Sequence, residues 1–475
     1  MVFSSSSFLF AFLPVTLVLY FLPISLKNKK REIGKKNLVL LVTSLVFYAW
    51  GEPVYVLLML ISIFFNFSIG RDIFLCEREN KKRMKLFLFT VAIVFNFFVM
   101  AYFKYYGFVA ENINSLFGTD IQIRELPLPV GISFYTFQAV SYIADVYKGK
   151  VKAQRHLIPF ACYITMFPQL IAGPIVQYSD IEKQLKERTV SSALFYEGII
   201  VFIRGLGKKV IFANTAGKIY TDILAEGITE QSSLTAWIGI VAYTMQIYFD
   251  FGGYSDMAIG LGKMLGFEFR ENFNFPYRAQ SITDFWRRWH ISLSSWFRDY
   301  VYIPLGGNRK GTARTIFNIL TVWSLTGLWH GAAWNFIVWG AFYGILLIAE
   351  KYLLSGIISR LPSFINRIIT LVVVMVGWVF FSSESLSGAT EYLSVMFNAG
   401  GAALYDSKAL YLLATSGFGL TVMALSSFGF FDSLPKPKNK TVSTAAQSLF
   451  YIAVFVISTA FLLSETYNPF LYFRF

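Results

Sequence analysis

Long apolar runs recur along almost the whole chain, and they restrict the possible folds more than any other feature of the sequence. Hydrophobic residues make up 55% of the 475 residues and charged residues only 15%, against about 25% charged residues in an ordinary soluble protein. Many of the runs approach the roughly 20 residues that a helix needs to cross a bilayer. The sequence therefore predicts an all-α, polytopic membrane protein.

We expect about eleven to thirteen membrane elements, counted by this length criterion, in a single domain that covers residues 1–475. The predicted spans lie near residues 8–26, 37–50, 54–75, 86–106, 128–147, 192–213, 234–262, 313–329, 331–350, 366–383, 408–431 and 447–464. Residues 157–177 are also apolar, but Pro168, Gly173 and Pro174 interrupt them. An interrupted helix at membrane depth needs protein or a water-filled cavity around it. Both a re-entrant segment that lines a cavity and an ordinary kinked span satisfy this condition.

Basic residues gather in short loops between the apolar runs. The chain has 42 Lys and Arg against 28 Asp and Glu, a net charge of +14. Loops 27–36, 77–85 and 148–155 are strongly basic, whereas the loop near 110–126 has Arg124 against three acidic residues. By the positive-inside rule, this alternation predicts an extracytoplasmic N-terminus. The distribution also favours contact with anionic membrane lipid and argues against nucleic-acid binding, because no compact basic domain is apparent.

The cysteines and the N-terminus exclude several other classes of protein. Cys76 and Cys162 each lie alone among apolar residues, and no CxxC pair or His/Cys cluster offers a set of metal ligands. We therefore expect two buried thiols, no metal and no resident cofactor. Residues 1–10 lack the positive segment of a cleavable signal peptide, which suits an uncleaved first span.

A histidine within an apolar stretch is the first candidate for chemistry. His330 is flanked by Gly327 and Gly331, a spacing that lets another backbone or a narrow ligand come close. Thr326 and Trp334 stand four residues away on either side, so we expect all three side chains to share one helical face. An imidazole at membrane depth could take a proton from a hydroxyl and return it to a leaving group. The alternative is a hydrogen-bonded core histidine beside a helix-packing motif.

The second candidate histidine lies in an aromatic and basic segment. Residues 281–284 resemble a helix start, with a side-chain cap and an acid in the first turn. The apolar residues that follow recur every three or four positions: Phe285, Trp289, Leu293, Trp296 and Tyr300. This pattern predicts one amphipathic helix in the membrane interface, with its tryptophans at headgroup depth. His290 falls at the boundary between the two faces, and a plain membrane anchor is the alternative interpretation.

The arginines near His290 have two interpretations, and three further ionisable residues are expected to have no catalytic role. Arg287, Arg288 and Arg298 could receive the phosphates of a coenzyme A or phosphopantetheine donor, or equally the headgroups of anionic lipids. Asp250 and Asp256 do not share a helical face unless the glycines between them break the helix, so we expect them to hold backbone or arginine hydrogen bonds. His156, at the edge of a basic loop, is expected to be solvated. No Ser-His-Asp order, glycine-rich phosphate loop or zinc spacing is convincing.

Several of these passages together resemble one known family. The clearest are Asp284–Leu293, Tyr302–Asn308 and Gly327–Gly331, with Asp250–Ala258 and Asn274–Tyr277 before them. As a set they resemble the membrane-bound O-acyltransferases. More narrowly, they are similar to the bacterial branch that contains the alginate O-acetyltransferase membrane subunit and the teichoic-acid D-alanyl transfer protein. The resemblance runs through residues 1–350, and residues 351–475 match mainly as further membrane helices.

The resemblance implies a site and an architecture. In that family the histidine of the Leu-Trp-His-Gly segment is the proposed catalytic base, and the histidine of the Trp-Arg-Arg-Trp-His segment is the second functional residue. These are His330 and His290 here. The resemblance also implies re-entrant and interfacial helices around a central funnel or tunnel where donor and acceptor meet from opposite sides. The candidate tunnel-lining residues are Gly327, Trp329, Gly331 and Trp334.

The expected function is acyl transfer across the bacterial cytoplasmic membrane. An acyl group, most simply acetyl, would pass from acetyl-CoA or an acyl-carrier-protein thioester to a hydroxyl of an extracytoplasmic polysaccharide or of a partner protein. Nothing in the chain resembles the hydrolase-like extracytoplasmic domain of such systems, so we expect a separate acetylation partner. Three alternatives stay open: D-alanyl transfer from a carrier-protein thioester toward teichoic acid, a proton-coupled transporter, whose inverted repeats are not apparent, and a structural assembly platform.

Overall fold

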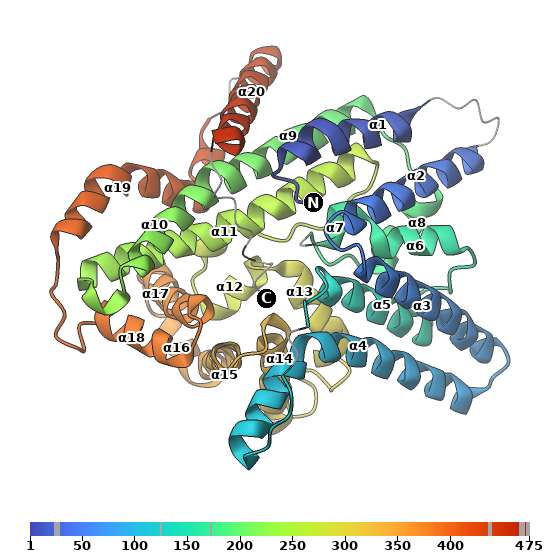
Figure 1. Ribbon diagram of the computed structural model, residues 1–475, viewed down its shortest axis with the longest axis horizontal. Helices are drawn as coiled ribbons and strands as arrows, with labels where there is room; N and C mark the ends of the chain where they lie inside the picture. The colour runs from blue at the N-terminus through green and yellow to red at the C-terminus, as the bar shows by residue number, and fades with distance from the viewer. Residues whose placement is uncertain (23–28, 124–125, 172, 436–438, 465–470, 472–475) are drawn as a thin grey trace. The chain divides into compact units, whose positions relative to one another are not determined.

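The computed structural model describes residues 1–22, 29–123, 126–171, 173–435, 439–464 and 471 (Figure 1). Across these residues the regular elements are helices, and no β-strand occurs among them. Six helical segments are long and apolar enough to cross a membrane: Tyr55–Arg78, Lys82–Phe117, Trp334–Ile358, Ser363–Ser382, Ser407–Ser427 and Thr441–Ser464. The predicted all-α, polytopic membrane class is confirmed.

The chain divides into two compact units. Unit 1 comprises Met1–Phe202 and Ser255–Arg270, and unit 2 comprises Ile203–Tyr254 and Glu271–Phe475. Helices α9 (Ser192–Gly207) and α11 (Ser233–Met264) each contribute residues to both units. The grouping of residues 1–475 as one functional domain stays a prediction.

Unit 1 is a helical bundle with a fully enclosed helix. Its other elements are η1 (Phe8–Phe12), α1 (Leu13–Phe21), α2 (Lys29–Ala49), α3 (Tyr55–Arg78), α4 (Lys82–Phe117), α5 (Ile132–Tyr147), α6 (Leu157–Thr165), α7 (Phe167–Leu170) and α8 (Tyr178–Lys186). Helices α3 and α4 are joined by reciprocal hydrogen bonds between the side-chain amides of Asn66 and Asn96, at 3.0 and 2.8 Å. Every residue from Ile132 to Val146 of α5 is buried.

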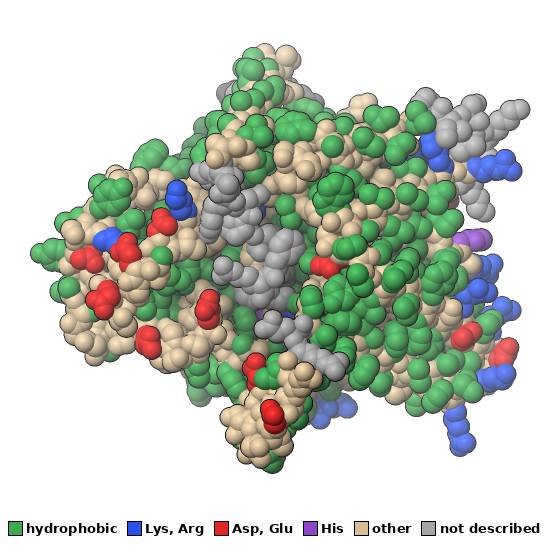
Figure 2. Space-filling model, in the orientation of Figure 1, with side chains coloured by type: hydrophobic (Ala, Val, Ile, Leu, Met, Phe, Trp, Pro, Cys, Tyr) green, Lys and Arg blue, Asp and Glu red, His purple; other side chains and the backbone are tan. Residues whose placement is uncertain are grey.

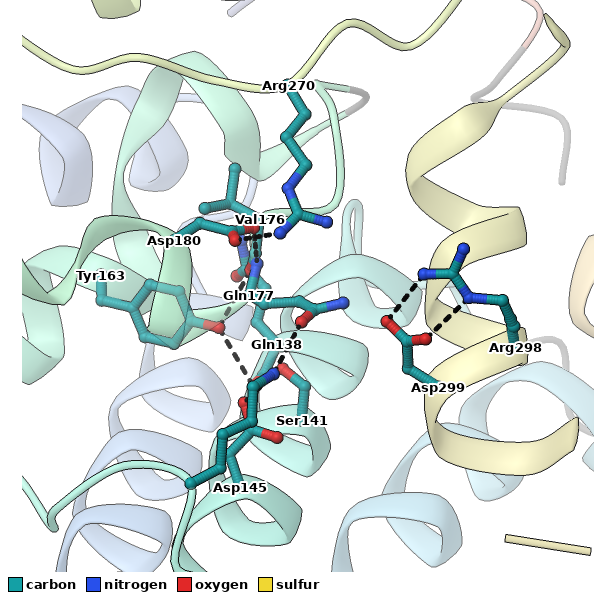
Figure 3. A network of polar contacts seen from close by, with 11 residues as sticks. Gln138, Ser141, Asp145, Tyr163, Val176, Gln177, Asp180, Arg270, Arg298 and Asp299 are labelled. Carbon is teal, nitrogen blue, oxygen red and sulfur yellow. Dashed lines mark hydrogen bonds and ion pairs between the residues drawn. The ribbon is translucent and has the colours of Figure 1, made fainter. Parts of the chain in front are cut away.

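The predicted interruption in residues 157–177 is confirmed. Helix α6 ends at Thr165 and α7 begins at Phe167, and the residues from Phe160 to Ile171 are buried in unit 1. The hydroxyl of Tyr163 donates to the carbonyl oxygens of Gln138 and Val176, at 3.2 and 3.0 Å (Figure 3). Protein groups therefore surround the break, as an interrupted helix requires.

Lys and Arg side chains gather at one edge of unit 1, beside a broad hydrophobic surface (Figure 2). In Figure 1 the start of α2 and the junction between α3 and α4 lie at that edge. The side chains of Lys81, Lys82 and Arg83 at this junction are exposed. Basic loops at one end of a bundle are the arrangement on which the positive-inside rule depends. The extracytoplasmic position of the N-terminus stays a prediction.

Unit 2 contains the remaining helices. They are η2 (Lys208–Ala213), α10 (Asn214–Ala225), α12 (Ile282–Arg288), α13 (Ile291–Phe297), η5 (Arg298–Tyr302), α14 (Thr312–His330), α15 (Trp334–Ala349), η6 (Glu350–Leu354), α16 (Ser355–Ile358), α17 (Ser363–Ser382), α18 (Leu386–Met396), α19 (Ser407–Ser427) and α20 (Lys440–Ser464), with the short turns η3 (Ile228–Glu230), η4 (Pro276–Arg278) and η7 (Phe431–Ser433).

Helices α14 and α15 form a tight hairpin. A β-carbon on Gly327 would stand 2.5 Å from the carbonyl oxygen of Phe336, and one on Gly340 would stand 2.5 Å from that of Trp323. The close backbone approach predicted around Gly327 is confirmed.

We expect Gly340→Ala to lower the free energy of unfolding by about 1–3 kcal/mol, because an added methyl group would force the α14–α15 hairpin apart. Gly419→Ala in α19 is the matched control, because a β-carbon there meets no atom within 4 Å. Unfolding of both variants would be followed in detergent by helical circular dichroism. Equal stability of the two variants would contradict the tight packing of the hairpin.

Candidate active site

The segment around His290 is two short helices and not the single amphipathic helix predicted. The predicted start is confirmed, because the Ser281 hydroxyl accepts a hydrogen bond from the Asp284 backbone N–H at 3.1 Å. Helix α12 then ends at Arg288, and His290 adopts the left-handed conformation, with φ 45° and ψ 54°, before α13 begins. Non-glycine residues in this conformation are uncommon and cluster at functional sites.

Asn272 explains why the helix breaks at this point. Its backbone carbonyl accepts from the N–H of Ile291 at 2.9 Å, and its side-chain oxygen accepts from the N–H of Ser292 at 3.2 Å. These are N–H groups at the start of α13, which lack partners within their own helix. Four residues of the predicted apolar stripe are buried in unit 2: Phe285, Leu293 and the two tryptophans expected at headgroup depth, Trp289 and Trp296. The prediction of one continuous helix is therefore wrong, and these four side chains pack against protein.

The same asparagine determines which nitrogen of His290 carries the proton. The Asn272 side-chain oxygen lies 3.1 Å from Nδ1 of His290 and also accepts from the backbone N–H and the hydroxyl of Ser292. An atom that accepts from a backbone N–H must be the amide oxygen, so Nδ1 of His290 is the donor. The Nε2 atom then keeps its lone pair. Burial lowers the pKa of His290 to about 3, so the ring is neutral near pH 7.

This lowered pKa predicts a pH-dependent stability. Below about pH 6.5, the ordinary pKa of histidine, His290 binds a proton in the unfolded chain but not in the folded protein. The free energy of unfolding therefore decreases as the pH is lowered from about 6.5 to about 3. We expect wild type to lose more thermal stability than His290→Asn between about pH 7.5 and about pH 5. Asparagine tolerates the left-handed backbone. The exposed His156 supplies the control variant, His156→Asn, and parallel pH profiles for wild type and His290→Asn would refute the assignment.

His330 is the last residue of α14 and is only 6% exposed. Its ring is enclosed by Trp329, Trp339 and Phe381, whose ring centroids lie 4.9, 5.0 and 5.1 Å away. The prediction that Trp334 shares a helical face with His330 is wrong. Helix α14 ends at His330, and Trp334 begins the next helix with 56% of its surface exposed.

The two histidines stand between two cavities of unit 2. The larger has a volume of about 320 Å³, and the smaller has a volume of about 20 Å³. Trp289, His290 and His330 line both. The smaller cavity holds about one water-sized group, and its other walls are mainly apolar: Ile247, Phe251, Trp339, Trp378, Phe381 and Leu471, together with Asp250. Both histidines therefore border a cavity with room for a small reactant and a second cavity with room for only a group of about the size of a water molecule.

Two of the three predicted donor-binding arginines lie at the larger cavity. Arg287 and Arg298 line it together with Ser294 and Thr326. Arg298 also forms an ion pair with Asp299, at 2.8 and 3.3 Å (Figure 3). Arg288 is not among the described residues that line either cavity. Its guanidinium forms an ion pair with Asp284 at 2.8 Å within α12.

The four predicted tunnel-lining residues are outside the described lining of the two cavities. The described residues that line the two cavities do not include Gly327, Trp329, Gly331 or Trp334. Gly327 is in contact with α15, and a β-carbon on Gly331 would stand 2.3 Å from the ring of Phe336. Trp329 is buried between the two histidines, with its ring centroid 6.1 Å from that of His290. Gly327 and Gly331 therefore act here in helix packing.

Comparison with known proteins identifies the family of this chain. A family model described as MBOAT, the membrane-bound O-acyltransferase family, matches residues 151–388. The chain is 40% identical to a protein named "Probable alginate O-acetylase" from Pseudomonas putida, over 100% of both chains. It is 34% identical to a peptidoglycan O-acetyltransferase of Helicobacter pylori, over 85% of this chain and 81% of the other. The chain belongs to the membrane-bound O-acyltransferase family.

Membership of the membrane-bound O-acyltransferase family makes this chain a membrane enzyme that transfers acyl groups to hydroxyls. A more distant relative, a teichoic acid D-alanyltransferase of Bacillus subtilis, is 32% identical over 47% of this chain and 59% of its own. The family match contains His290, His330, Arg287 and Arg298, so the cavities described above lie largely within the part of the chain that defines this O-acyltransferase.

Sequence reasoning missed three residues of the site. Asn272 precedes the Asn274–Tyr277 passage by two positions, and only its contacts with His290 show its role. Trp339 and Phe381 enclose His330 from α15 and α17. An aromatic residue in an apolar helix carries no signal that separates a cavity wall from a lipid-facing position, so these two could not have been found from the sequence.

Proposed function

We propose that this enzyme transfers an acetyl group from a cytoplasmic thioester across the bacterial cytoplasmic membrane to a hydroxyl of an extracytoplasmic polysaccharide. The observation that carries the proposal is the position of His290 and His330 between a large cavity with two arginines and a small, mainly apolar one. The relatives named for O-acetylation of alginate and of peptidoglycan support acetyl as the group and a polysaccharide as the acceptor.

In this proposal the donor occupies the larger cavity. Arg287 and Arg298 bind the phosphates of acetyl-CoA, or of a carrier protein's phosphopantetheine, through charge-assisted hydrogen bonds. The cavity volume of about 320 Å³ is in the range of sites for small molecules. The thioester carbonyl then lies near the two histidines, and the acetyl methyl points toward the aromatic walls of the smaller cavity.

His330 is the general base of the proposed reaction. It takes the proton of the acceptor hydroxyl, whose oxygen attacks the thioester carbonyl carbon. The tetrahedral intermediate collapses, the carbon–sulfur bond breaks, and the imidazolium returns its proton to the leaving thiolate. Neutral His290, with Nδ1 held by Asn272, presents a lone pair on Nε2, which orients the donor or relays the proton.

The direct acceptor is either the polysaccharide or a hydroxyl on a partner protein that then acylates the polysaccharide. We propose that a separate extracytoplasmic protein completes the reaction. The resemblance to teichoic acid D-alanyltransferase covers only 47% of this chain, which favours acetyl over D-alanyl transfer.

The test is transfer of radiolabelled acyl groups by the purified protein in lipid nanodiscs. Acetyl-CoA, an acetyl-carrier-protein thioester and a D-alanyl-carrier-protein thioester would each be offered with polysaccharide acceptors from the native membrane. Acetyl transfer from either acetyl donor supports the proposal. Transfer of D-alanine alone would replace it with the teichoic-acid function, and solute flux without acyl transfer would replace it with transport.

A further inference from the structure

Unit 2 contains a buried ion pair that the proposed reaction does not use. The Nζ atom of Lys209 lies 2.6 Å from Oδ1 of Asp250, and the two residues are 1% and 2% exposed. Lys209 also donates to the side-chain oxygen of Asn214 at 3.0 Å. Removing two charges from water costs several kcal/mol for each ion. A buried pair of charged residues in such an apolar protein therefore indicates a role in function.

The backbone around Lys209 is shaped to bring the pair together. Lys209 lies in η2, a π-helical turn, and such turns are frequent at functional sites. A β-carbon on Gly253 would stand 2.7 Å from the carbonyl oxygen of Gly205 and 2.9 Å from the backbone nitrogen of Lys209. Only glycine allows this approach of α11 to η2, which explains Gly253, three positions after Asp250 in the Asp250–Ala258 passage.

The second oxygen of the Asp250 carboxylate contacts Leu471, which is 221 positions later in the sequence. Oδ2 accepts a hydrogen bond from the backbone N–H of Leu471 at 2.9 Å. Leu471 is 8% exposed. Both residues line the smaller cavity together with His290 and His330. One carboxylate therefore joins η2, α11 and Leu471 at the wall of the cavity that borders the candidate catalytic rings.

We propose that Lys209 and Asp250 are positioning residues that hold Leu471 as a wall of the smaller cavity and so keep bulk water out of the acyl-transfer step. This inference rests on the proposed acyl transfer. In the side reaction that the wall prevents, a water oxygen attacks the thioester carbonyl, the carbon–sulfur bond breaks, and the products are a free carboxylic acid and the thiol. A charged pair suits this role because a hydrogen bond to an ionised carboxylate is about twice as strong as a neutral one.

A purely structural ion pair makes a different prediction. Apolar residues of similar volume often replace a buried ion pair without loss of stability. The double variant Lys209→Met/Asp250→Leu would then fold and behave as wild type. If the pair positions Leu471, this folded double variant loses the bond to the Leu471 N–H and hydrolyses its donor.

The first experiment measures how the donor's acyl group is divided between acceptor and water. Wild type, Asp250→Ala, the double variant and Lys408→Met would be compared in nanodiscs with radiolabelled acetyl-CoA and polysaccharide. Lys408 is the matched control, because it forms an ion pair with Glu226, whose side chain is 61% exposed. We expect the ratio of free acetate to transferred acetyl to rise by roughly tenfold, the effect of one lost hydrogen bond to a charged group, in both Asp250 variants and not in the control. A wild-type ratio in the folded double variant would overturn the proposal.

A second measurement does not depend on activity. In Leu471→Cys, a water-soluble maleimide would report access to position 471, because the native Cys76 and Cys162 are buried. We expect slow labelling when Asp250 is present and labelling about tenfold faster in Leu471→Cys/Asp250→Ala. Equal rates would overturn the contact itself. If wild type transfers no acyl group from any donor, the proposed function fails while the labelling rates still decide whether Asp250 holds Leu471.

Discussion

His330→Ala is expected to lower acyl transfer by about 10²–10⁴-fold, the contribution typical of a positioned acid–base group. His330 is 6% exposed, and its ring lies within about 5 Å of the centroids of Trp329, Trp339 and Phe381. Water therefore has little room to replace the imidazole as a base. Steady-state transfer from whichever donor supports acyl transfer would be measured in nanodiscs, with kcat and KM separated.

Two further variants make the His330 experiment decisive. His330→Gln keeps most of the side-chain volume, so it separates loss of the base from collapse of the aromatic enclosure. His156→Ala removes an exposed histidine at the start of α6 and should leave transfer unchanged. Wild-type turnover in folded His330→Ala would contradict the assignment and make His290, with its Nε2 lone pair, the base.

Removing Arg287 and Arg298 is expected to weaken donor binding selectively. Each hydrogen bond to a charged group contributes about 1.5–3 kcal/mol, so the double variant Arg287→Ala/Arg298→Ala should raise KM for acetyl-CoA by at least about 10²-fold. A truncated thioester without phosphates, such as S-acetyl-N-acetylcysteamine, should show an almost unchanged KM. The comparison of the two donors measures recognition of the phosphates alone.

Arg288 provides the control for this prediction. It is the chain neighbour of Arg287, but it pairs with Asp284 at 2.8 Å and lies outside the described lining of both cavities. Arg288→Ala should therefore leave KM for acetyl-CoA unchanged. Equal losses with both donors in the double variant would show that the arginines support the fold or bind lipid headgroups and do not recognise the donor.

The sequence by itself determined the class of the protein and its two central residues. The length of an apolar run and the spacing of basic loops are local properties, and the thickness of a bilayer converts them directly into helices. A histidine among apolar residues is likewise visible without a structure, because an ionisable group there needs a reason. The capping of α12 by Ser281 could also be predicted from the sequence, because a cap depends on residues only three positions apart.

The tertiary structure alone decided how these residues form a site. The left-handed turn at His290 depends on Asn272, 18 positions earlier, and the bond from Leu471 to Asp250 joins residues 221 positions apart. The local pattern predicted a continuous helix because aromatic residues recur at helical spacing, and it carried no information on which distant carbonyl would compete for the N–H groups of Ile291 and Ser292. Ion pairs, cavity walls and tautomers result from contacts between segments far apart in the chain, so only the folded protein determines them.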